Sequence, residues 1–241
     1  MSTFVLVHAA WHDGLAWTDV MHCLESRGHT TFGPTLPGRG PDASTRISHG
    51  DLSRSIVNFV VDRDLTDVVL VGHSYGGTVV SKAVEEIADR VRRLVYVAGH
   101  VLKDGESMEQ AAPPHYRDMF MELAAASSDN TVALPFDVWR TAFINDADPE
   151  LARLTYERLC PEPYQPIVEP LDLKKFYSLT TPKSYILGSD DISMPAGDWG
   201  YHPRYTSRLG EHRFLELPGS HEVIFTNPNG LADKIIEASG D

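Results

Sequence analysis

The segment DVVLVGHSYGGTVVSKA, residues 67–83, constrains the fold of this chain more than any other. It changes from β-branched and aliphatic residues before Gly72 to a helical pattern after Gly77, with Ser74 at the joint. A sharp strand-to-helix turn lifts a serine clear of the sheet and crowds the positions two before and two after it. Gly72 and Gly76 occupy those positions. We therefore predict that Ser74 is a catalytic nucleophile and not a serine in an ordinary glycine-rich turn.

Strand-like and helix-like patterns alternate on both sides of this segment, which is typical of parallel strands joined by crossover helices. We expect strands at residues 4–8, 30–32, 68–71, 94–98, 184–187 and 214–217, and helices at residues 17–26, 51–62, 78–88 and 230–238. This alternation breaks at residues 103–179, where prolines separate short helical pieces. The sequence thus predicts an α/β core from residues 1–102 and 180–241, with residues 103–179 inserted as a cap.

Composition limits the classes of partner. The chain has 241 residues, 42% of them hydrophobic, which is enough for one sizeable core. A net charge of −13 disfavours nucleic acid and anionic membranes and favours a small-molecule substrate. No apolar run approaches the roughly 20 residues of a membrane span. Only two cysteines and no secretion-type leader lead us to expect free thiols and a cytoplasmic location. The oligomeric state, a homodimer included, stays open.

Several motifs together resemble the α/β-hydrolase superfamily over nearly the whole chain. FVLVHAAWHDGLAWTDV, VGHSYGG, GSDDISMP and LPGSHE occur in the order, and at about the spacing, of a compact branch. This branch contains plant hydroxynitrile lyases, plant methyl esterases and many bacterial esterases. A weaker similarity, in length and in the opening FVLVH…WHDG, is to bacterial carbamate-cleaving esterases that hydrolyse carbendazim. The resemblance implies a mostly parallel sheet with helices on both faces, an inserted cap, a Ser-His-Asp triad and no cofactor.

The resemblance also locates the base and the acid. In this topology the base comes from a loop after the last strand, where LPGSHE carries His221. The acid follows the preceding strand, where Asp190 and Asp191 both stand. In the similar hydrolases it usually follows a glycine by three residues and precedes a proline by four, which selects Asp191. Asp190 is the alternative acid. If it is not the acid, we interpret it as a carboxylate that binds backbone amides of the turn. Asp104 is the next candidate.

An oxyanion needs two backbone amides, one just after the nucleophile and one from the loop after the first strand, which are those of Tyr75 and Ala10. The loop carries Ala9 where related esterases have glycine, and it lacks the threonine with which the lyases hold a cyanohydrin hydroxyl. Glu222 follows His221 where those lyases have a lysine that stabilises cyanide. Because a carboxylate there would repel cyanide, hydrolysis is favoured over lyase activity.

The other histidines predict no metal site. His8 and His12 are four residues apart, but His8 ends a strand and the segment then turns at Gly14, so their rings need not converge. We expect His73 to pack beside the strand-to-helix turn. The remaining candidates are interpreted as ordinary surface or loop residues: His29, His49, His115, His202 and His212.

The cap and the loop after the first strand are expected to shape the substrate pocket. We predict that four residues line it: Ala9, Trp11, Trp139 and Phe143. They belong to an apolar set that also includes Met119, Phe120, Met121 and Tyr164. The sequence thus predicts a serine hydrolase that cleaves an ester, carbamate or amide of a small apolar or aromatic substrate through an acyl-enzyme. A lyase or other non-hydrolytic enzyme, or a ligand receptor on this fold, is the alternative.

Overall fold

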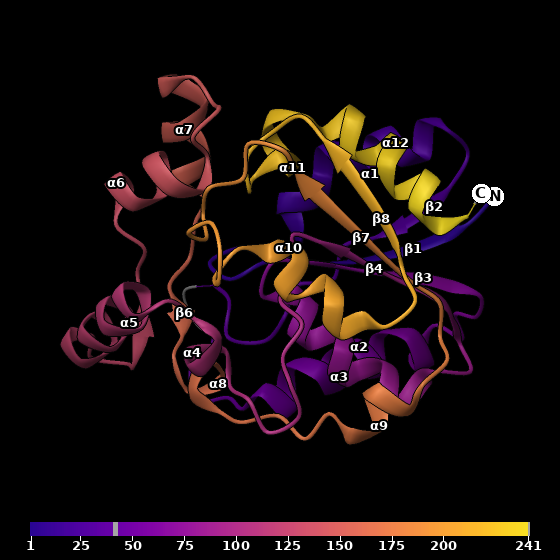
Figure 1. The fold of residues 1–241 in the computed structure, drawn as a ribbon, viewed down its shortest axis with the longest axis horizontal. Helices are drawn as coiled ribbons and strands as arrows, with labels where there is room; N and C mark the ends of the chain where they lie inside the picture. Colours follow the sequence, from indigo (N-terminus) through magenta and orange to yellow (C-terminus); the bar gives the residue numbers. More distant parts are fainter. Residues whose placement is uncertain (41–42, 241) are drawn as a thin grey trace.

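Residues 1–40 and 43–240, which the computed structural model describes, are organised around a six-stranded parallel sheet (Figure 1). Its strands are β1 (Thr3–Val7), β2 (Thr30–Phe32), β3 (Val68–His73), β4 (Val91–Val97), β7 (Lys183–Gly188) and β8 (Arg213–Leu217). They lie in the order β2-β1-β3-β4-β7-β8, and every neighbouring pair is parallel. The α/β fold expected from the alternating pattern is confirmed.

Helices cover both faces of this sheet (Figure 1). On one face lie α2 (His49–Asp62) and α3 (Gly76–Ile87), and on the other α1 (Thr18–Ser26) and α12 (Pro228–Ser239). The central strands are therefore buried on both sides, which explains why β3 reads as an unbroken apolar run. No helix of the described residues is long and apolar enough to cross a bilayer.

Residues 103–179 contribute a set of short elements. These are α4 (Met108–Ala111), α5 (Pro114–Ala126), α6 (Phe136–Val138), a π-helical turn (Trp139–Phe143), α7 (Pro149–Tyr156), α8 (Gln165–Val168), α9 (Lys174–Ser178) and the two-stranded pair β5 (Thr131–Val132) and β6 (Glu162–Pro163). In Figure 1, α5, α6 and α7 stand beyond the end of the sheet toward which the strand arrows point. In contrast, α9 packs against α3 on the core.

The observed bounds differ from the expected ones by a few residues, for local reasons. The last helix, α12, begins at Pro228 and not at Gly230, because proline suits the first turn of a helix. The side chain of Asn227 caps it by accepting a hydrogen bond from the backbone of Gly230 at 3.0 Å. Two short α-helices, α10 (Tyr201–Arg204) and α11 (Val223–Thr226), flank the loops that follow β7 and β8, and two 3-10 helices span Gly14–Trp17 and Thr206–Leu209.

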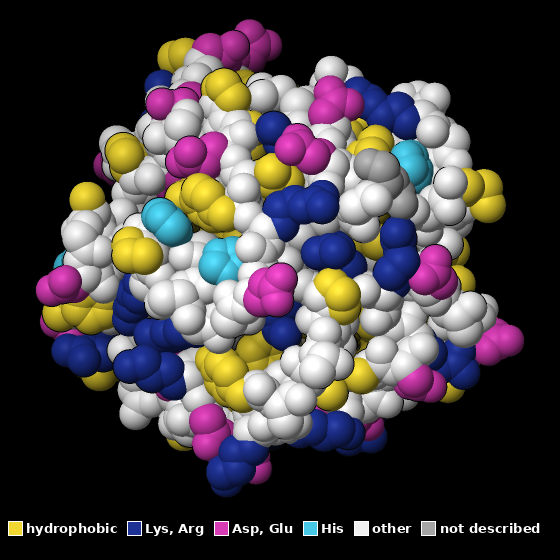
Figure 2. Space-filling view, turned by 45° about the vertical axis from the view of Figure 1, so that its right-hand side comes forward, with side chains coloured by type: hydrophobic (Ala, Val, Ile, Leu, Met, Phe, Trp, Pro, Cys, Tyr) yellow, Lys and Arg dark blue, Asp and Glu magenta, His cyan; other side chains and the backbone are white. Residues whose placement is uncertain are grey.

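The two ends of the sheet have different chemical character. Lys and Arg side chains gather near the middle of the face in Figure 2. Arg93, Lys183 and Arg213 line an open groove where β4, β7 and β8 begin. Ser74 instead follows the carboxyl end of β3. The carboxyl ends of parallel strands are the usual place for ligands in such sheets, so the groove is at the opposite end from the predicted nucleophile.

Candidate active site

The joint between β3 and α3 holds Ser74 in a strained conformation. Its φ is +50°, in the left-handed region, which costs a non-glycine residue about 1–3 kcal/mol. Two backbone hydrogen bonds hold it there: the Ser74 amide donates to Val97 at 3.0 Å, and its carbonyl accepts from His100 at 2.9 Å. Neighbouring strands therefore fix the serine rather than its own segment alone.

The glycines around Ser74 are required by space. A Cβ added to Gly72 would lie 2.7 Å from the carbonyl oxygen of Gly76. One added to Gly76 would lie 2.7 Å from the carbonyl oxygens of both Val7 and His8 at the end of β1. These distances are shorter than any van der Waals contact, so the crowding inferred from the sequence is present in the fold.

The structure brings Ser74, His221 and Asp191 together. His221 Nε2 lies 2.8 Å from Ser74 Oγ, and His221 Nδ1 lies 2.8 Å from Asp191 Oδ2. The other oxygen of Asp191 accepts hydrogen bonds from Ser193, from its amide at 2.9 Å and its hydroxyl at 2.7 Å. The side chains of His221 and Asp191 are each 1% exposed. The imidazole is thus fixed with Nδ1–H toward the carboxylate and its Nε2 lone pair toward the serine hydroxyl.

Neither of the other two candidate acids bonds to His221. Asp190 is exposed, and its Oδ2 accepts from the amide of Gly219 at 3.1 Å, which is the turn-binding role considered from the sequence. Asp104 accepts from the amide of Leu173 at 2.9 Å, far along the inserted segment. The glycine and proline spacing therefore selects the aspartate that contacts the histidine.

The surroundings of His221 favour its protonated form. Burial lowers the pKa of His221, but the Asp191 carboxylate and its hydrogen bond, together with Glu222, raise it above its usual value. Aromatic rings confine the imidazole: Tyr201 stacks on it at 5.5 Å between centroids, and Phe143 meets it edge-on at 5.5 Å. This environment stabilises the imidazolium that forms when a histidine takes a proton from serine.

Ala10 and Tyr75 line the same cavity as Ser74. Neither N–H donates a hydrogen bond to any group in residues 1–40 or 43–240. Trp11 adopts φ of +61°, which turns the loop after β1, and its amide donates to Glu162 Oε2 at 2.9 Å. The two amides thus have no competing acceptor among the described residues, and their role as oxyanion donors stays a prediction.

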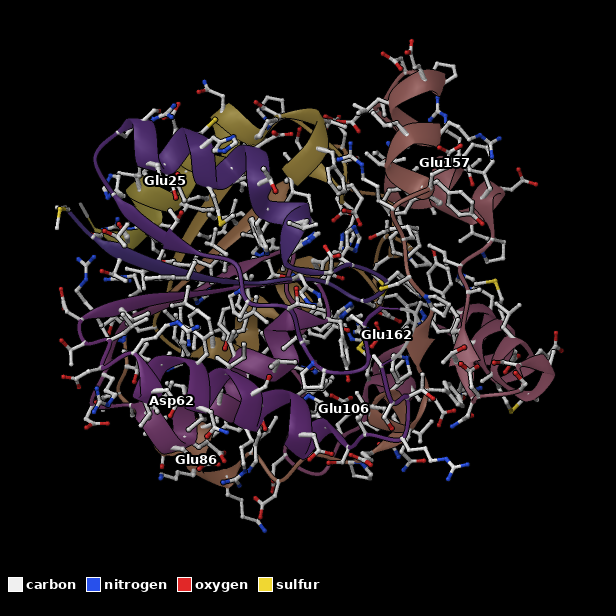
Figure 3. All side chains as sticks on the ribbon, turned by 180° about the vertical axis from the view of Figure 1, so that it is seen from behind. Glu25, Asp62, Glu86, Glu106, Glu157 and Glu162 are labelled. Atoms are coloured by element: carbon white, nitrogen blue, oxygen red, sulfur yellow. The ribbon has the colours of Figure 1, made fainter. Side chains whose placement is uncertain are left out.

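A buried ion pair that the sequence did not reveal holds this loop. Arg39 Nη2 contacts both carboxylate oxygens of Glu162, at 2.6 and 2.7 Å, and its Nε donates to the carbonyl of His12 at 3.0 Å. Figure 3 shows Glu162 between the sheet and the cap helices. The side chains of Arg39 and Glu162 are 1% and 0% exposed. The partners of Glu162 are more than a hundred residues away in the sequence, so no local motif could have predicted this ion pair.

The cavity beside Ser74 has a mostly apolar wall, and the predicted lining is partly correct. Trp11 and Phe143 line it, as does Phe120. Further lining comes from Met108, Ala112, Tyr116, Ile167, Met194 and Tyr201, with His100 and Ser193 as polar members.

Two of the predicted lining residues lie elsewhere. Ala9 is outside the lining, and its carbonyl accepts a hydrogen bond from the His8 ring at 2.8 Å. Trp139 is fully buried one layer behind the cavity, stacked on Phe143, because its indole N–H donates to the carbonyl of Ala152 at 3.1 Å. Periodicity and residue type do not distinguish such a second layer from the wall itself.

Glu222 also lies outside the cavity lining. It is 1% exposed and forms an ion pair with His12, Oε2 to Nε2, at 3.4 Å. The Glu222 carboxylate lies within 4.8 Å of a ring nitrogen of His221, so the argument that its charge would repel departing cyanide stays a prediction. Burial alone would raise the pKa of Glu222, but His12, with His73 and His221, lowers it to about 2.

Three further histidines, His8, His73 and His49, form hydrogen bonds within the protein. His8 donates to Ala9 and accepts from the amide of Leu36 at 3.0 Å, so neither ring nitrogen is left for a metal. His73 packs beside the joint and donates to the carbonyl of His221 at 3.0 Å, as predicted. The expectation for His49 was wrong. It is buried at the start of α2, and its Nε2 lies 2.9 Å from the hydroxyl of Thr78.

Three side chains lie close enough together to hold a metal ion, but one of them is already committed to the contacts described above. Among the described residues, the ligand atoms of His73, His221 and Glu222 lie within 4.8 Å of one another. His221, however, uses both ring nitrogens for Ser74 and Asp191. The arrangement therefore fits proton transfer at a serine better than metal binding.

Comparison with known proteins identifies the family. The alpha/beta hydrolase family matches residues 4–234. The chain belongs to this family. It is 31% identical to a carbendazim hydrolyzing esterase of Nocardioides sp. (strain SG-4G), over 98% of both chains. It is 23% identical to the putative methylesterase 15, chloroplastic, of Arabidopsis thaliana, over 98% of this chain and 56% of that protein, so it spans about half of the plant protein.

A solved structure covers the whole chain. An extracellular alpha/beta-hydrolase from a Paenibacillus species, described as sharing structural and functional homology with tobacco salicylic acid binding protein 2, matches with a TM-score of 0.97 and 36% identity over 100% of both chains. The α/β-hydrolase fold and the resemblance to methylesterases and to a carbendazim-hydrolysing esterase are thus confirmed. Because its family and these relatives are hydrolases and esterases, the chain is an esterase-type hydrolase.

Proposed function

We propose that the protein is a serine hydrolase that cleaves the ester, carbamate or amide bond of a small apolar or aromatic substrate through an acyl-enzyme. The observation that carries this proposal is the chain of two 2.8 Å contacts from Asp191 through His221 to Ser74 Oγ, at the wall of an apolar cavity. Two of the relatives support it, since one is named as a carbendazim hydrolyzing esterase and the other as a putative methylesterase.

The mechanism follows from the positions of these groups. Ser74 Oγ attacks the substrate carbonyl carbon while His221 Nε2 takes the hydroxyl proton, and Asp191 stabilises the imidazolium. The amides of Ala10 and Tyr75 bind the oxyanion. His221 then protonates the leaving alcohol or amine as it departs. In the second half, His221 takes a proton from the water molecule that attacks the acyl carbon. It then returns this proton to Ser74 Oγ as the bond between Oγ and the acyl carbon breaks and the acid leaves.

A substrate panel tests this proposal. Aryl esters, aryl carbamates, anilides and mandelonitrile are assayed with the wild type and with Ser74→Ala, which removes only the hydroxyl. We expect release of acid and alcohol from at least one ester or carbamate, and its loss in the variant. Cyanide release from mandelonitrile without ester cleavage would favour the lyase alternative, and tight binding without turnover would favour a receptor.

We further propose a class of partner, a cellular location and an oligomeric state. The small-molecule partner, with no nucleic acid or membrane, rests on the net charge of −13. The cytoplasmic location rests on the small number of cysteines, two in this sequence. The Paenibacillus protein, by contrast, is described as extracellular. A dimer would be detected by the mass of the protein in solution.

A further inference from the structure

His100 is a buried histidine at the cavity that the triad chemistry does not use. It follows β4 after Ala98 and Gly99, is 4% exposed and lines the same cavity as Ser74. Its backbone amide donates to the carbonyl of Ser74 at 2.9 Å, so its position is tied to that of the nucleophile. The close approach of α3 reinforces this link, since a Cβ on Gly77 would lie 2.8 Å from the His100 carbonyl.

Aromatic rings fix the orientation of the His100 imidazole. Tyr201 lies at 5.4 Å and Tyr205 at 5.2 Å between ring centroids, the latter edge-on. Nδ1 is enclosed and has no hydrogen-bond partner among the described residues. Nε2 is not enclosed in this way and bonds to no described group either, so it is the ring atom that a molecule in the cavity can reach.

Most other polar side chains of the cavity already have partners in the protein. The indole N–H of Trp11 donates to the carbonyl of Val132 at 2.9 Å. Ser193 donates to Asp191, and its oxygen lies 3.2 Å from the hydroxyl of Tyr201. Besides His100, two hydroxyls of the lining residues make no hydrogen bond to a described residue. One is that of Tyr116, on the cap helix α5, and the other is that of Tyr75, which is enclosed and therefore out of reach of a molecule in the cavity.

The charge state of His100 limits what it can recognise. Burial lowers its pKa well below the usual value, and the nearby His221, Arg204 and Arg208 lower it further, so the imidazole is neutral. A neutral imidazole carries one proton. On the enclosed Nδ1 that proton would be a buried donor without an acceptor, which proteins rarely tolerate. On Nε2 it points to where a ligand can accept it.

We propose that His100 is a specificity-determining residue that donates one hydrogen bond, from Nε2–H, to an acceptor atom on an uncharged and otherwise apolar substrate. This inference deepens the proposed function and rests on it for the word substrate. The favoured ligands are aromatic compounds with one ring nitrogen or ether oxygen in place of a carbon, because the rest of the wall is apolar. A pure hydrocarbon would leave the buried N–H of His100 without an acceptor, so the site should bind a hydrocarbon less well than a ligand that carries an acceptor.

Binding of three bicyclic compounds tests the inference without requiring catalysis. Quinoline carries one acceptor, indole one donor, and naphthalene neither, and all are uncharged near neutral pH. Ligand-detected NMR gives each Kd for the wild type and for His100→Phe, which keeps a ring but removes the donor. We expect the Kd of quinoline relative to that of naphthalene to rise about threefold to tenfold in the variant, as for one neutral hydrogen bond.

Matched variants separate His100 from its surroundings. Tyr116→Phe removes the other unpaired polar group that a molecule in the cavity can reach, and it should leave the quinoline to naphthalene ratio unchanged. His100→Gln, which retains an N–H donor, should restore part of the preference. If His100→Phe does not fold, His100→Leu compared with His100→Gln supplies the same ratio. An unchanged ratio in the His100 variants, a loss confined to Tyr116→Phe, or a preference for indole that depends on His100 would each overturn the inference.

Hydrolysis of paired substrates then connects binding to specificity. Para-nitrophenyl esters of a quinoline carboxylic acid and of naphthoic acid differ by one ring atom. We expect the kcat/KM ratio of this pair to fall about threefold to tenfold in His100→Phe. If the wild type cleaves neither ester while the Kd ratio changes as stated, the proposed hydrolase function fails and the recognition by His100 stands. If both esters are cleaved but the kcat/KM ratio is the same in the wild type and in His100→Phe, the hydrolase function stands and the recognition by His100 fails.

Discussion

Two buried histidine–carboxylate pairs of the protein are joined in the chain, because Glu222 directly follows His221. They differ in their distances and in the group that the second ring nitrogen of each histidine contacts. In the first, His221 bonds Asp191 at 2.8 Å and presents its other nitrogen to Ser74 Oγ at 2.8 Å. In the second, His12 faces Glu222 at a looser 3.4 Å, and its Nδ1 donates to the carbonyl of Ala10 at 2.6 Å. In both pairs the carboxylate raises the pKa of the histidine above its usual value, against the effect of burial.

The comparison shows that pairing alone does not define a catalytic base. Ser74 offers a hydroxyl proton to His221, whereas the Ala10 carbonyl offers none to His12 and can only accept one. We therefore expect the first pair to transfer protons and the second to hold the loop that carries Ala10. His12 and Glu222 are then positioning residues, and their loss should affect activity much less than loss of Asp191.

The largest expected effect is at the acid of the first pair. Asp191→Asn should preserve the fold but favour the wrong imidazole tautomer, with a loss in kcat that can reach about 10⁴-fold. Asp190→Asn is the matched control one residue away, and it should change kcat little because that carboxylate binds the turn. Steady-state kinetics on one aryl ester compare the two, after thermal unfolding shows both to be folded. A crippled Asp190→Asn with an active Asp191→Asn would reverse the assignment.

The second pair should respond mainly in stability. Glu222→Gln removes the carboxylate that faces His12 in the interior, and we expect a loss of about 1–3 kcal/mol in the free energy of unfolding. Because the Ala10 loop then loses support, kcat should fall by about tenfold, less than the 10²-fold or more seen when an oxyanion donor is removed. Urea unfolding and kinetics measure both. A kcat loss equal to that of Asp191→Asn would mean that the second pair is catalytic.

The stability of the second pair should depend on pH in a defined window. Glu222 has a lowered pKa of about 2, so its contribution is present above its ordinary value of 4.5 and is lost as the pH falls toward 2. His12 has a raised pKa, so its contribution is full below about 6.5 and is lost as the pH rises through its folded value. The difference in unfolding free energy between wild type and Glu222→Gln should therefore be largest at about pH 5–6. A difference independent of pH would show that the pair is uncharged.

The smallest expected effect concerns the pH dependence of the first pair. His221 must be neutral to take the serine proton, and its pKa is raised, so kcat/KM should fall with decreasing pH at a midpoint above about 6.5. Glu222 contributes to that increase, and Glu222→Gln should move the midpoint to lower pH by less than about one unit. A midpoint that moves upward would contradict this electrostatic assignment.

The sequence was most informative where chemistry depends on local spacing. The turn around Ser74 needs small residues two positions away on each side, and the loops after the last two strands carry His221 and Asp191 in a fixed order. Such constraints act within a few residues. The fold could be predicted for the same reason, because alternating strand and helix patterns are local.

The rest depended on contacts between distant segments. Glu162 reaches Arg39 and Trp11 across more than a hundred residues, and neither its type nor its neighbours signal this. Trp139 belongs to the apolar set of the cap that is predicted to line the cavity, yet it lies one layer behind the wall, where its indole N–H donates to the carbonyl of Ala152. His49 begins α2 and is buried by the facing helix α3. Burial of a single polar residue is decided by tertiary packing and not by its own sequence segment.

Covalent labelling tests the central claim, that Ser74 is the nucleophile activated by His221, most directly. The protein is treated with a serine-directed organophosphonate, and intact mass and peptide mapping locate the adduct while residual ester hydrolysis is followed. We predict one adduct per chain on Ser74, loss of activity in proportion to labelling, and no adduct in Ser74→Ala. Full inactivation with Ser74 unmodified, or an adduct on another residue that abolishes activity, would contradict the account.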